Sequence, residues 1–456
     1  MAPQQRASVA EVLAEEISAL SPARLPPQLR RVIDDLLLDV IGLCLAARQT
    51  DYVAAALAGA EGDGACTLIG QARQVSSTAA ALINGIAAHG EDFDDTFEGG
   101  PVHAGAVVVP AVLAAAERFR PEGPAALLGM AVGIETICRL SLVAPRRVHD
   151  SGFHPTSVFG AMAAAIAAAV TLGLCGRQMV NAWGIAGSMA GGLIEYLADG
   201  SSTKRLHAGW AAQAGMQAAL LARAGFTGPR TVFEGRHGLF NGFARYRDGD
   251  YAKLTDGFGK LWVAETLAFK PFACGTMIHP YLDCARRVTA QGVPAEAIAE
   301  IVCEAAEGTV QRLWEPLAEK QAPPNAYAAK FSTPFCIALA FITGDVGLAA
   351  FTEANLADPR LRALAAKIRY TIDPQNPYPT SYTGHMRVVL RDGQVVEERQ
   401  PHLRGGALQP LSRAEIEGKF FANAAHGGWP HARAAAARDL ARRLFDGPVD
   451  LGVLRG

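Results

Sequence analysis

The densest group of residues able to do acid–base chemistry lies between His89 and His103, in the sequence HGEDFDDTFEGGPVH. Five of the eight positions from Glu91 to Glu98 are acidic. Because neighbouring carboxylates repel one another, a folded protein keeps them only if they are solvated, hydrogen-bonded, metal-bound or partly protonated. Three interpretations stay open: a polar helix end before a Gly-Gly-Pro loop, a metal site, or acid–base catalysis by a carboxylate together with His103.

The metal interpretation depends on Asp94, Asp95 and Glu98, which fit the pattern DDxxE. This pattern resembles the aspartate-rich motif of the all-α isoprenoid synthases, in which carboxylates hold Mg²⁺ for a diphosphate. Such an enzyme needs a second metal motif, rich in Asn and Asp with a following Ser or Thr and Glu, and none stands out in the chain. We therefore expect no metal site, and a magnesium-dependent isoprenoid synthase remains an alternative from a different class.

Acid–base catalysis needs partners elsewhere in the chain, and three segments supply candidates. His154 directly precedes a stretch without charge that runs to Gly176, where a helix N-terminus could offer amide donors to an anion or His154 could simply cap the helix. The segment DGSSTKRLHAG contains Lys204 and His207, and we expect it to form a cationic turn suited to a carboxylate. Lys270, in FKPFACGTMIHP, stands at an expected domain junction, a preferred place for small-molecule sites, although a surface lysine is the ordinary interpretation.

The elements that must position these residues are mostly helices. Residues 8–269 consist of Ala-rich helical stretches broken by Gly and Pro. Ser8 and Glu11 predict a capping box at the first helix, and Pro27 and Pro110 suit helix starts or the turns before them.

After Lys270 the pattern changes, and apolar and polar residues alternate in 300–304 and 367–372 as in strands. Residues 386–390 and 394–397 flank Asp392-Gly393, a dipeptide typical of tight hairpin turns with positive φ angles. A second capping box at Ser412 predicts a return to helix. We expect a mainly α protein, with a helical domain formed by residues 1–268 and 405–456 and an inserted α+β lid domain formed by residues 269–404.

The composition narrows the classes of partner. The 456 residues carry 42 Lys and Arg against 44 Asp and Glu, a net charge of −2 without a basic block, which argues against nucleic acid or an anionic membrane surface as partner. Eight cysteines without a CxxC motif indicate reduced, buried thiols. The N-terminal sequence lacks the pattern of a secretory signal, so we expect a cytoplasmic protein. We expect the uncharged stretch 155–176, rich in Ala and Gly, to be a buried helix.

Six motifs occur in the order EDFDDT…H, GFHPTSVFG, STKRLHAGWAAQAG, FKPFACGTMIHP, AKFSTPF and PLSRAEIEGKF. Their ordered set resembles the MmgE/PrpD family, which includes 2-methylcitrate dehydratase, cis-aconitate decarboxylase and iminodisuccinate epimerase. The resemblance implies a large helical domain with an inserted α+β lid, a homodimer, and catalysis without metal or nucleotide. By likeness to the decarboxylases, the active-site positions are Asp92, Thr96, His103, His154, Lys204 and Lys270. Among these, Lys204, Lys270 and Thr96, together with His207, would bind substrate.

The resemblance thus implies a lyase or isomerase that acts next to a carboxylate of a small di- or tricarboxylate. The nominal reaction is that of 2-methylcitrate dehydratase. An iminodisuccinate-type epimerase and a cis-aconitate decarboxylase are alternatives within the family, and an inactive carboxylate-binding protein is an alternative outside catalysis. Two departures bear on the choice: His103-Ala104-Gly105 replaces the His-Pro-Ser of many relatives after a longer loop, and Phe335 falls where the decarboxylases have an active-site tyrosine.

Overall fold

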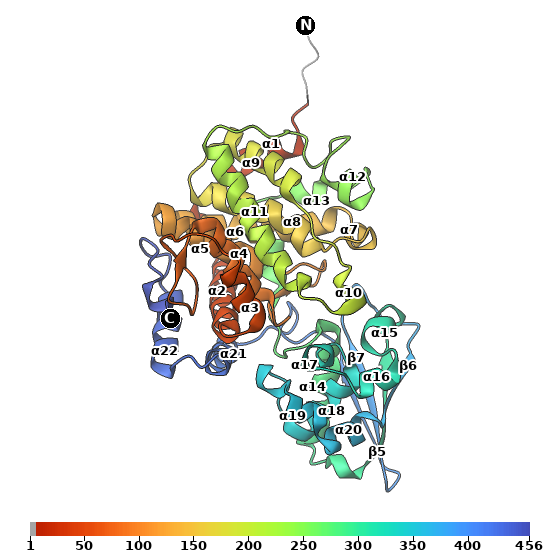
Figure 1. Ribbon diagram of the computed structural model, residues 1–456. Helices are drawn as coiled ribbons and strands as arrows, with labels where there is room; N and C mark the ends of the chain where they lie inside the picture. The colour runs from red at the N-terminus through yellow and green to blue at the C-terminus, as the bar shows by residue number, and fades with distance from the viewer. Residues whose placement is uncertain (1–5) are drawn as a thin grey trace. The chain divides into compact units, whose positions relative to one another are not determined.

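The computed structural model describes residues 6–456, which form two compact units. The first unit extends to Leu267 and resumes at Ile416, and the second comprises Ala268–Glu415. Helices dominate the chain, and Figure 1 shows the strands of the larger sheet confined to the second unit. The expected mainly α class with a smaller α+β part is confirmed.

The first unit is built almost entirely of helices (Figure 1). Its core is a layer in which α11 packs against α8 and α4, while α8 also packs against α6 and α5. The α-helices of this unit are α1 (Val9–Ser18), α2 (Pro27–Ala47), α3 (Asp51–Ala58), α4 (Ser77–His89), α5 (Gly105–Phe119), α6 (Gly123–Val143), α7 (Arg147–Asp150), α8 (Pro155–Thr171), α9 (Gly176–Met189), α10 (Tyr196–Asp199), α11 (Thr203–Arg223), α12 (Leu239–Ala244), α13 (Ala252–Thr255) and α22 (His431–Ala441), and α21 (Arg413–His426) leads into it from the second unit. Short strands β1 (Cys66–Thr67), β2 (Gln74–Val75) and β3 (Thr96–Phe97) lie between the helices, and β4 (Leu267–Ala268) lies at the junction of the units.

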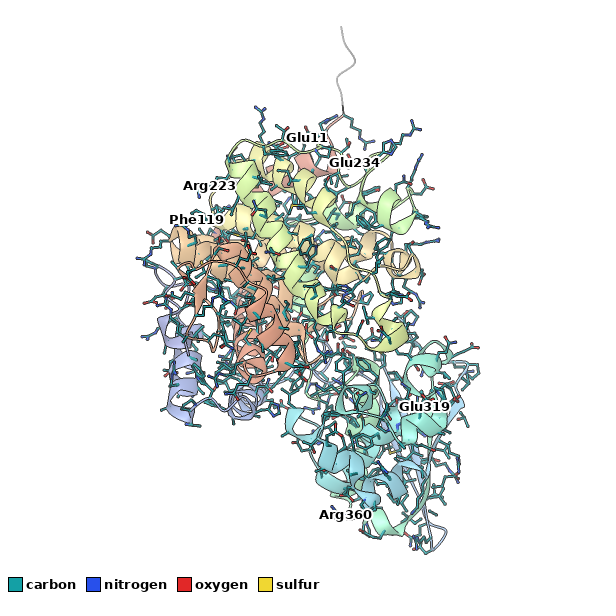
Figure 2. The ribbon with its side chains drawn as sticks, in the orientation of Figure 1. Glu11, Phe119, Arg223, Glu234, Glu319 and Arg360 are labelled. Carbon is teal, nitrogen blue, oxygen red and sulfur yellow. The ribbon has the colours of Figure 1, made fainter. Side chains whose placement is uncertain are left out.

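Two helix starts follow the expected capping chemistry. The Ser8 hydroxyl accepts a hydrogen bond from the Glu11 main-chain N–H, and the Glu11 carboxylate accepts one from the Ser8 N–H at 2.7 Å. Val9 N–H also donates to Glu234 at 3.2 Å, and Figure 2 shows Glu11 and Glu234 at the same end of the first unit. Ser412 and Glu415 form the second predicted box at α21, with Ser412 N–H donating to Glu415 at 2.8 Å.

Of the two prolines predicted at helix starts or in the turns before them, Pro27 is confirmed and Pro110 is wrong. Pro27 is the first residue of α2, where its missing N–H costs nothing. Pro110, by contrast, lies inside α5 instead of at its start. The helix begins earlier, at Gly105, because the Asp95 carboxylate accepts hydrogen bonds from the N–H groups of Ala104 and Gly105.

The uncharged stretch after His154 is a core helix, as expected: every residue of α8 is buried. In the part of the chain that is described, one helix, α6, has the length and apolar composition to cross a membrane, and 89% of its apolar window is buried inside the protein. Seven of the eight cysteines are buried free thiols, and Cys175 is an exposed one.

The second unit contains a four-stranded sheet in the order β6-β5-β7-β8. β5 pairs parallel with β6, with Ile301 opposite Ile368, and antiparallel with β7, which pairs antiparallel with β8. The predicted strands and hairpin are confirmed, although only Gly393 of the Asp392-Gly393 turn has a positive φ, 88°. α14 packs on β7 and β8. The elements are β5 (Ile298–Ala305), β6 (Ile368–Ile372), β7 (Gly384–Leu390), β8 (Val395–Gln400), α14 (His279–Ala290), α15 (Glu307–Leu313), α16 (Leu317–Gln321), α17 (Ala326–Ala329), α18 (Thr333–Thr343), α19 (Glu353–Ala357) and α20 (Pro359–Ala365).

Candidate active site

Glycines bring together the two helices that carry most of the site. A Cβ on Gly85 of α4 would lie 2.6 Å from the Gly209 Cα of α11, and a Cβ on Gly209 would lie 2.1 Å from the Leu82 carbonyl oxygen. Only glycine permits such an approach. His89 ends α4 one turn after Gly85, and His207 lies two residues before Gly209, so this contact brings the two histidine-bearing helix segments together.

The end of α4 is also tied to the start of α11 by polar contacts. Arg205 Nε donates to the Gly90 carbonyl at 3.0 Å, and its guanidinium lies 4.8 Å from the centre of the Tyr52 ring. Tyr52 in turn donates from its hydroxyl to Glu91 at 3.0 Å. These contacts fix the first turn of α11 against the acidic segment.

Asp92 and Lys204, two predicted active-site residues, form a buried ion pair. Asp92 adopts a φ of 55°, in the left-handed region that few residues other than glycine occupy. Asp92 is 4% exposed and Lys204 is 5% exposed, so each charge compensates for the desolvation of the other. The segment containing Lys204 was expected to be a turn; it is instead the first turn of α11, which begins at Thr203.

The next carboxylate, Asp95, serves as the cap of α5. Its two oxygens accept hydrogen bonds of 2.9 Å from the N–H groups of Ala104 and Gly105, so it cannot act as an exposed ligand for a magnesium diphosphate. Burial, the Asp94 carboxylate and Asp39 raise the pKa of Asp95 to about 8, although the two N–H groups act in the opposite direction.

Asp94 lies between two histidines. His89 Nδ1 is 2.7 Å from Asp94 Oδ2, and His103 Nδ1 is 3.6 Å from Asp94 Oδ1. His103 Nδ1 is also 2.6 Å from the Asp95 carbonyl oxygen, which can only accept. The neutral His103 ring therefore carries its hydrogen on Nδ1 and leaves Nε2 as a proton acceptor. His103 is fixed further by its N–H, which donates to the Thr156 hydroxyl of α8 at 3.2 Å.

His154 and His207 form a second imidazole pair, with their Nδ1 atoms 3.1 Å apart. One of these atoms must donate and the other accept, so the two neutral rings are opposite tautomers. Burial lowers the pKa of His154 well below its usual value and that of His207 to about 4, and His89 and the Lys204 cation act in the same direction. His154 directly precedes α8, and its side chain makes no capping hydrogen bond, so the capping interpretation is wrong; the anion-binding interpretation stays a prediction.

The two imidazole pairs lie side by side. The His89 ring centre is 5.0 Å from that of His103 and 5.8 Å from that of His154. Of the predicted residues in the first unit, the structure therefore brings Asp92, His103, His154, Lys204 and His207 into one neighbourhood. Thr96 is buried in β3 directly after Asp95, and Lys270 is buried in the second unit; the roles of both stay predictions.

Comparison with known proteins decides the family. The model of the MmgE/PrpD N-terminal domain matches residues 11–252, and that of the MmgE/PrpD C-terminal domain matches residues 272–444. The chain belongs to the MmgE/PrpD family.

This MmgE/PrpD protein is similar to several proteins that are named cis-aconitate decarboxylase or cis-aconitate decarboxylase-like protein. Cis-aconitate decarboxylase of Mus musculus is 31% identical over 368 residues, which cover 76% of this chain and 72% of the relative. The cis-aconitate decarboxylase-like protein oryM of Aspergillus oryzae is 28% identical over 436 residues, covering 91% and 90%. The cis-aconitate decarboxylase of Aspergillus terreus is 26% identical over 387 residues, covering 79% and 77%.

Sequence reasoning gave no acid–base role to His89 or to Asp94, which it considered only as a metal ligand, and it did not consider Lys419. His89 and Asp94 lie within the acidic segment HGEDFDDTFEGGPVH. The signal that could have identified His89 is its position at the end of one apolar helix, with His103 just before the next. Lys419 of α21 contacts Asp39 at 2.8 Å and donates to the Phe93 carbonyl at 2.7 Å, so it holds the acidic segment from a distant part of the chain. No local pattern predicts that contact.

One group of side chains in residues 6–456 has the arrangement of metal ligands. Ligand atoms of His89, Asp94 and His103 lie within 4.8 Å of one another. Two imidazoles and a carboxylate suit zinc or iron. The expectation of a metal-free site stays a prediction.

Proposed function

We propose that this MmgE/PrpD protein is a lyase that makes or breaks a bond at the carbon next to a carboxylate of a small di- or tricarboxylate, without a metal or nucleotide cofactor. The observation that carries the proposal is the group of four imidazoles beside the buried Asp92–Lys204 pair. Proton transfer at carbon needs a base, an acid and a cation that stabilises the developing negative charge. This neighbourhood supplies each of them.

The residues divide the work by their charge. Lys204 carries a buried positive charge, which would stabilise a carbanion- or enolate-like intermediate in surroundings of low dielectric. His154 and His207 are neutral at neutral pH because their pKa values are low, so they can accept a proton or donate a hydrogen bond. His103 keeps 13% of its side chain exposed, which makes it the most accessible imidazole next to Asp94. Thr96 and Lys270 would bind substrate carboxylates or hydroxyl groups.

Two tricarboxylate reactions are the finer candidates. Dehydration of 2-methylcitrate is the nominal reaction of the family resemblance. Decarboxylation of cis-aconitate is the activity in the names of the relatives. Phe335 is buried in α18, at the position where the family resemblance places an active-site tyrosine of the decarboxylases. Because phenylalanine lacks the hydroxyl donor of that tyrosine, this difference favours dehydration over decarboxylation. Epimerisation of iminodisuccinate would use the same proton transfers on both faces of one carbon.

The test is turnover by purified, chelator-treated protein of 2-methylcitrate, cis-aconitate and iminodisuccinate, each followed by NMR. We expect at least one to be converted, with a rate that added divalent metal does not raise. His103→Ala should lower the rate by a factor of ~10²–10⁴. Tight binding of these acids without any conversion would instead identify a carboxylate-binding protein and overturn the proposal.

The proposal extends to the cellular location and the oligomeric state of the protein. A cytoplasmic homodimer is what the sequence and the family resemblance imply. Light scattering on the purified protein distinguishes a particle of twice 47.9 kDa from a monomer.

A further inference from the structure

His89 has the geometry of an acid–base residue although no predicted role includes it. The side chain is 1% exposed at the end of α4. Its Nδ1 lies 2.7 Å from Asp94 Oδ2, and a carboxylate oxygen can only accept, so the neutral ring carries its hydrogen on Nδ1. This is the relation by which a carboxylate fixes the tautomer of a catalytic histidine and stabilises the imidazolium that forms.

The other nitrogen of the ring has no protein partner. His89 Nε2 is buried and makes no hydrogen bond to any of residues 6–456. A buried acceptor without a partner costs free energy, and proteins keep such groups where function needs them. Because Nε2 is on the side of the ring away from Nδ1, this free lone pair points away from Asp94.

The surroundings of that ring are the other imidazoles of the site. His89 packs at 5.0 Å against His103 and at 5.8 Å, nearly parallel, against His154, measured between ring centres. His89 uses one nitrogen for a carboxylate and keeps the other unpaired among the groups that would handle protons.

We infer that His89, held by Asp94, is a further catalytic residue that exchanges a proton through Nε2 with the carboxylate substrate. The inference rests on the proposed function and names the base within it. The Nε2 lone pair takes the proton from the carbon next to the carboxylate, and the C–H electron pair stays on that carbon as an enolate-like anion. His89 becomes an imidazolium that Asp94 compensates. In epimerisation the reverse transfer returns the proton to carbon. In dehydration the electron pair forms the C=C bond as the C–O bond of the neighbouring carbon breaks, and the leaving hydroxyl group takes the proton of His89 and departs as water. In decarboxylation the C–CO₂ bond breaks and CO₂ leaves. The electron pair that stays on carbon then takes the proton from the His89 imidazolium.

Two substitutions of His89 separate its two nitrogens. His89→Asn keeps a nitrogen donor near the position of Nδ1 and can still bond Asp94, but it removes Nε2. We expect kcat to fall by a factor of ~10²–10⁴, while KM stays within about threefold and the melting temperature is retained. Asp94→Asn should lower kcat less than His89→Asn does, because the remaining amide oxygen can still accept from His89 Nδ1 but no longer carries the charge that compensates the imidazolium. His385→Gln is the matched control, since His385 Nδ1 also faces a carboxylate, Glu304, at 2.8 Å; its kcat should equal that of the wild type.

Retention of kcat within about threefold in His89→Asn would overturn the inference. So would a kcat of Asp94→Asn equal to that of the wild type, or equal losses in the His385→Gln control. If the wild type converts none of the three acids, the proposed function fails. The tautomer of His89 can still be tested without turnover, by nitrogen-15 NMR of the histidine rings. A His89 ring that carries its hydrogen on Nδ1 and leaves Nε2 unprotonated supports the inference, and an Nε2–H tautomer contradicts it.

Discussion

Asp94 and the main chain of Asp95 set the state of two imidazoles. Asp94 Oδ2 lies 2.7 Å from His89 Nδ1, and the Asp95 carbonyl oxygen lies 2.6 Å from His103 Nδ1. Both rings are thereby left with Nε2 as the acceptor. At this scale the chemistry depends on two hydrogen-bond acceptors in a segment of two residues, and the sequence shows their types but not their directions.

The Asp92–Lys204 pair permits a test that separates stability from catalysis. Lys204→Met leaves the Asp92 charge buried alone and should lower the free energy of unfolding by about 3 kcal/mol. The double variant Asp92→Asn/Lys204→Met removes both charges and should recover most of that loss. Both variants should still have kcat lowered by a factor of ~10²–10³, because the cation is absent. Urea unfolding and turnover are the measurements, and Lys253→Met, at an exposed position, is the control. Recovery of activity in the double variant would contradict the role of Lys204.

The imidazole pair makes a prediction about pH. The folded pKa of His207 is about 4 and its unfolded value is about 6.5, so the unfolded state binds more protons between these values. Stability contributed by the neutral His207 is therefore complete above pH 6.5 and is lost as pH falls towards 4, by about 3 kcal/mol. His207→Gln should lack this dependence, so the difference in unfolding free energy between wild type and variant should shrink over that interval. A difference that stays constant from pH 7 to 4 would show that His207 is not held neutral.

At the scale of elements, the close contact of α4 and α11 positions the histidines of the candidate site. Gly209→Ala would place a Cβ 2.1 Å from the Leu82 carbonyl oxygen, so the helices must separate. We expect a loss of at least ~1–3 kcal/mol in stability and a lower kcat, since His89 and His207 move apart. Gly242→Ala in α12 is the matched control, because a Cβ there meets open space and should raise stability by up to ~1 kcal/mol. Equal behaviour of the two variants would refute the positioning role of this contact.

A second element-scale prediction concerns α21, which returns to the first unit from the inserted one. Lys419 lies 2.8 Å from the buried Asp39 and 3.9 Å from the centre of the Phe93 ring. Lys419→Met should destabilise the protein by about 3–5 kcal/mol because it leaves a buried carboxylate without its cation. Chemical denaturation measures this loss. Lys419→Met combined with Asp39→Leu should restore part of it, and a double variant no more stable than the single one would argue against the pair.

At the scale of the whole molecule, the sequence predicted what local chemistry determines. Both capping boxes, the strands of the second unit and the buried helix α8 follow from residue types and periodicity alone. Pro110 was misplaced because the cap of α5 comes from Asp95, ten residues before the helix begins. Lys204 was expected in a turn because serines and glycine precede it, although α11 begins one residue earlier.

The sequence named several residues that the structure brings together, whose catalytic roles stay predictions, but it did not predict the contacts that join them. The family resemblance supplied Asp92, His103, His154 and Lys204. The Asp94 contacts and the support from Lys419 depend on side-chain directions and on contacts across more than 300 residues, which no short pattern encodes. His89 was passed over for this reason, since a histidine at the end of an apolar helix is ordinarily a packing residue.

The most direct test of the account is a crystal structure of the protein with a bound tricarboxylate such as 2-methylcitrate. We predict a substrate carboxylate within hydrogen-bond distance of Lys204 Nζ, and a reacting carbon ~3–3.5 Å from a nitrogen of the imidazole cluster. A tricarboxylate bound away from Lys204, with the four histidines left without contact to it, would contradict the account.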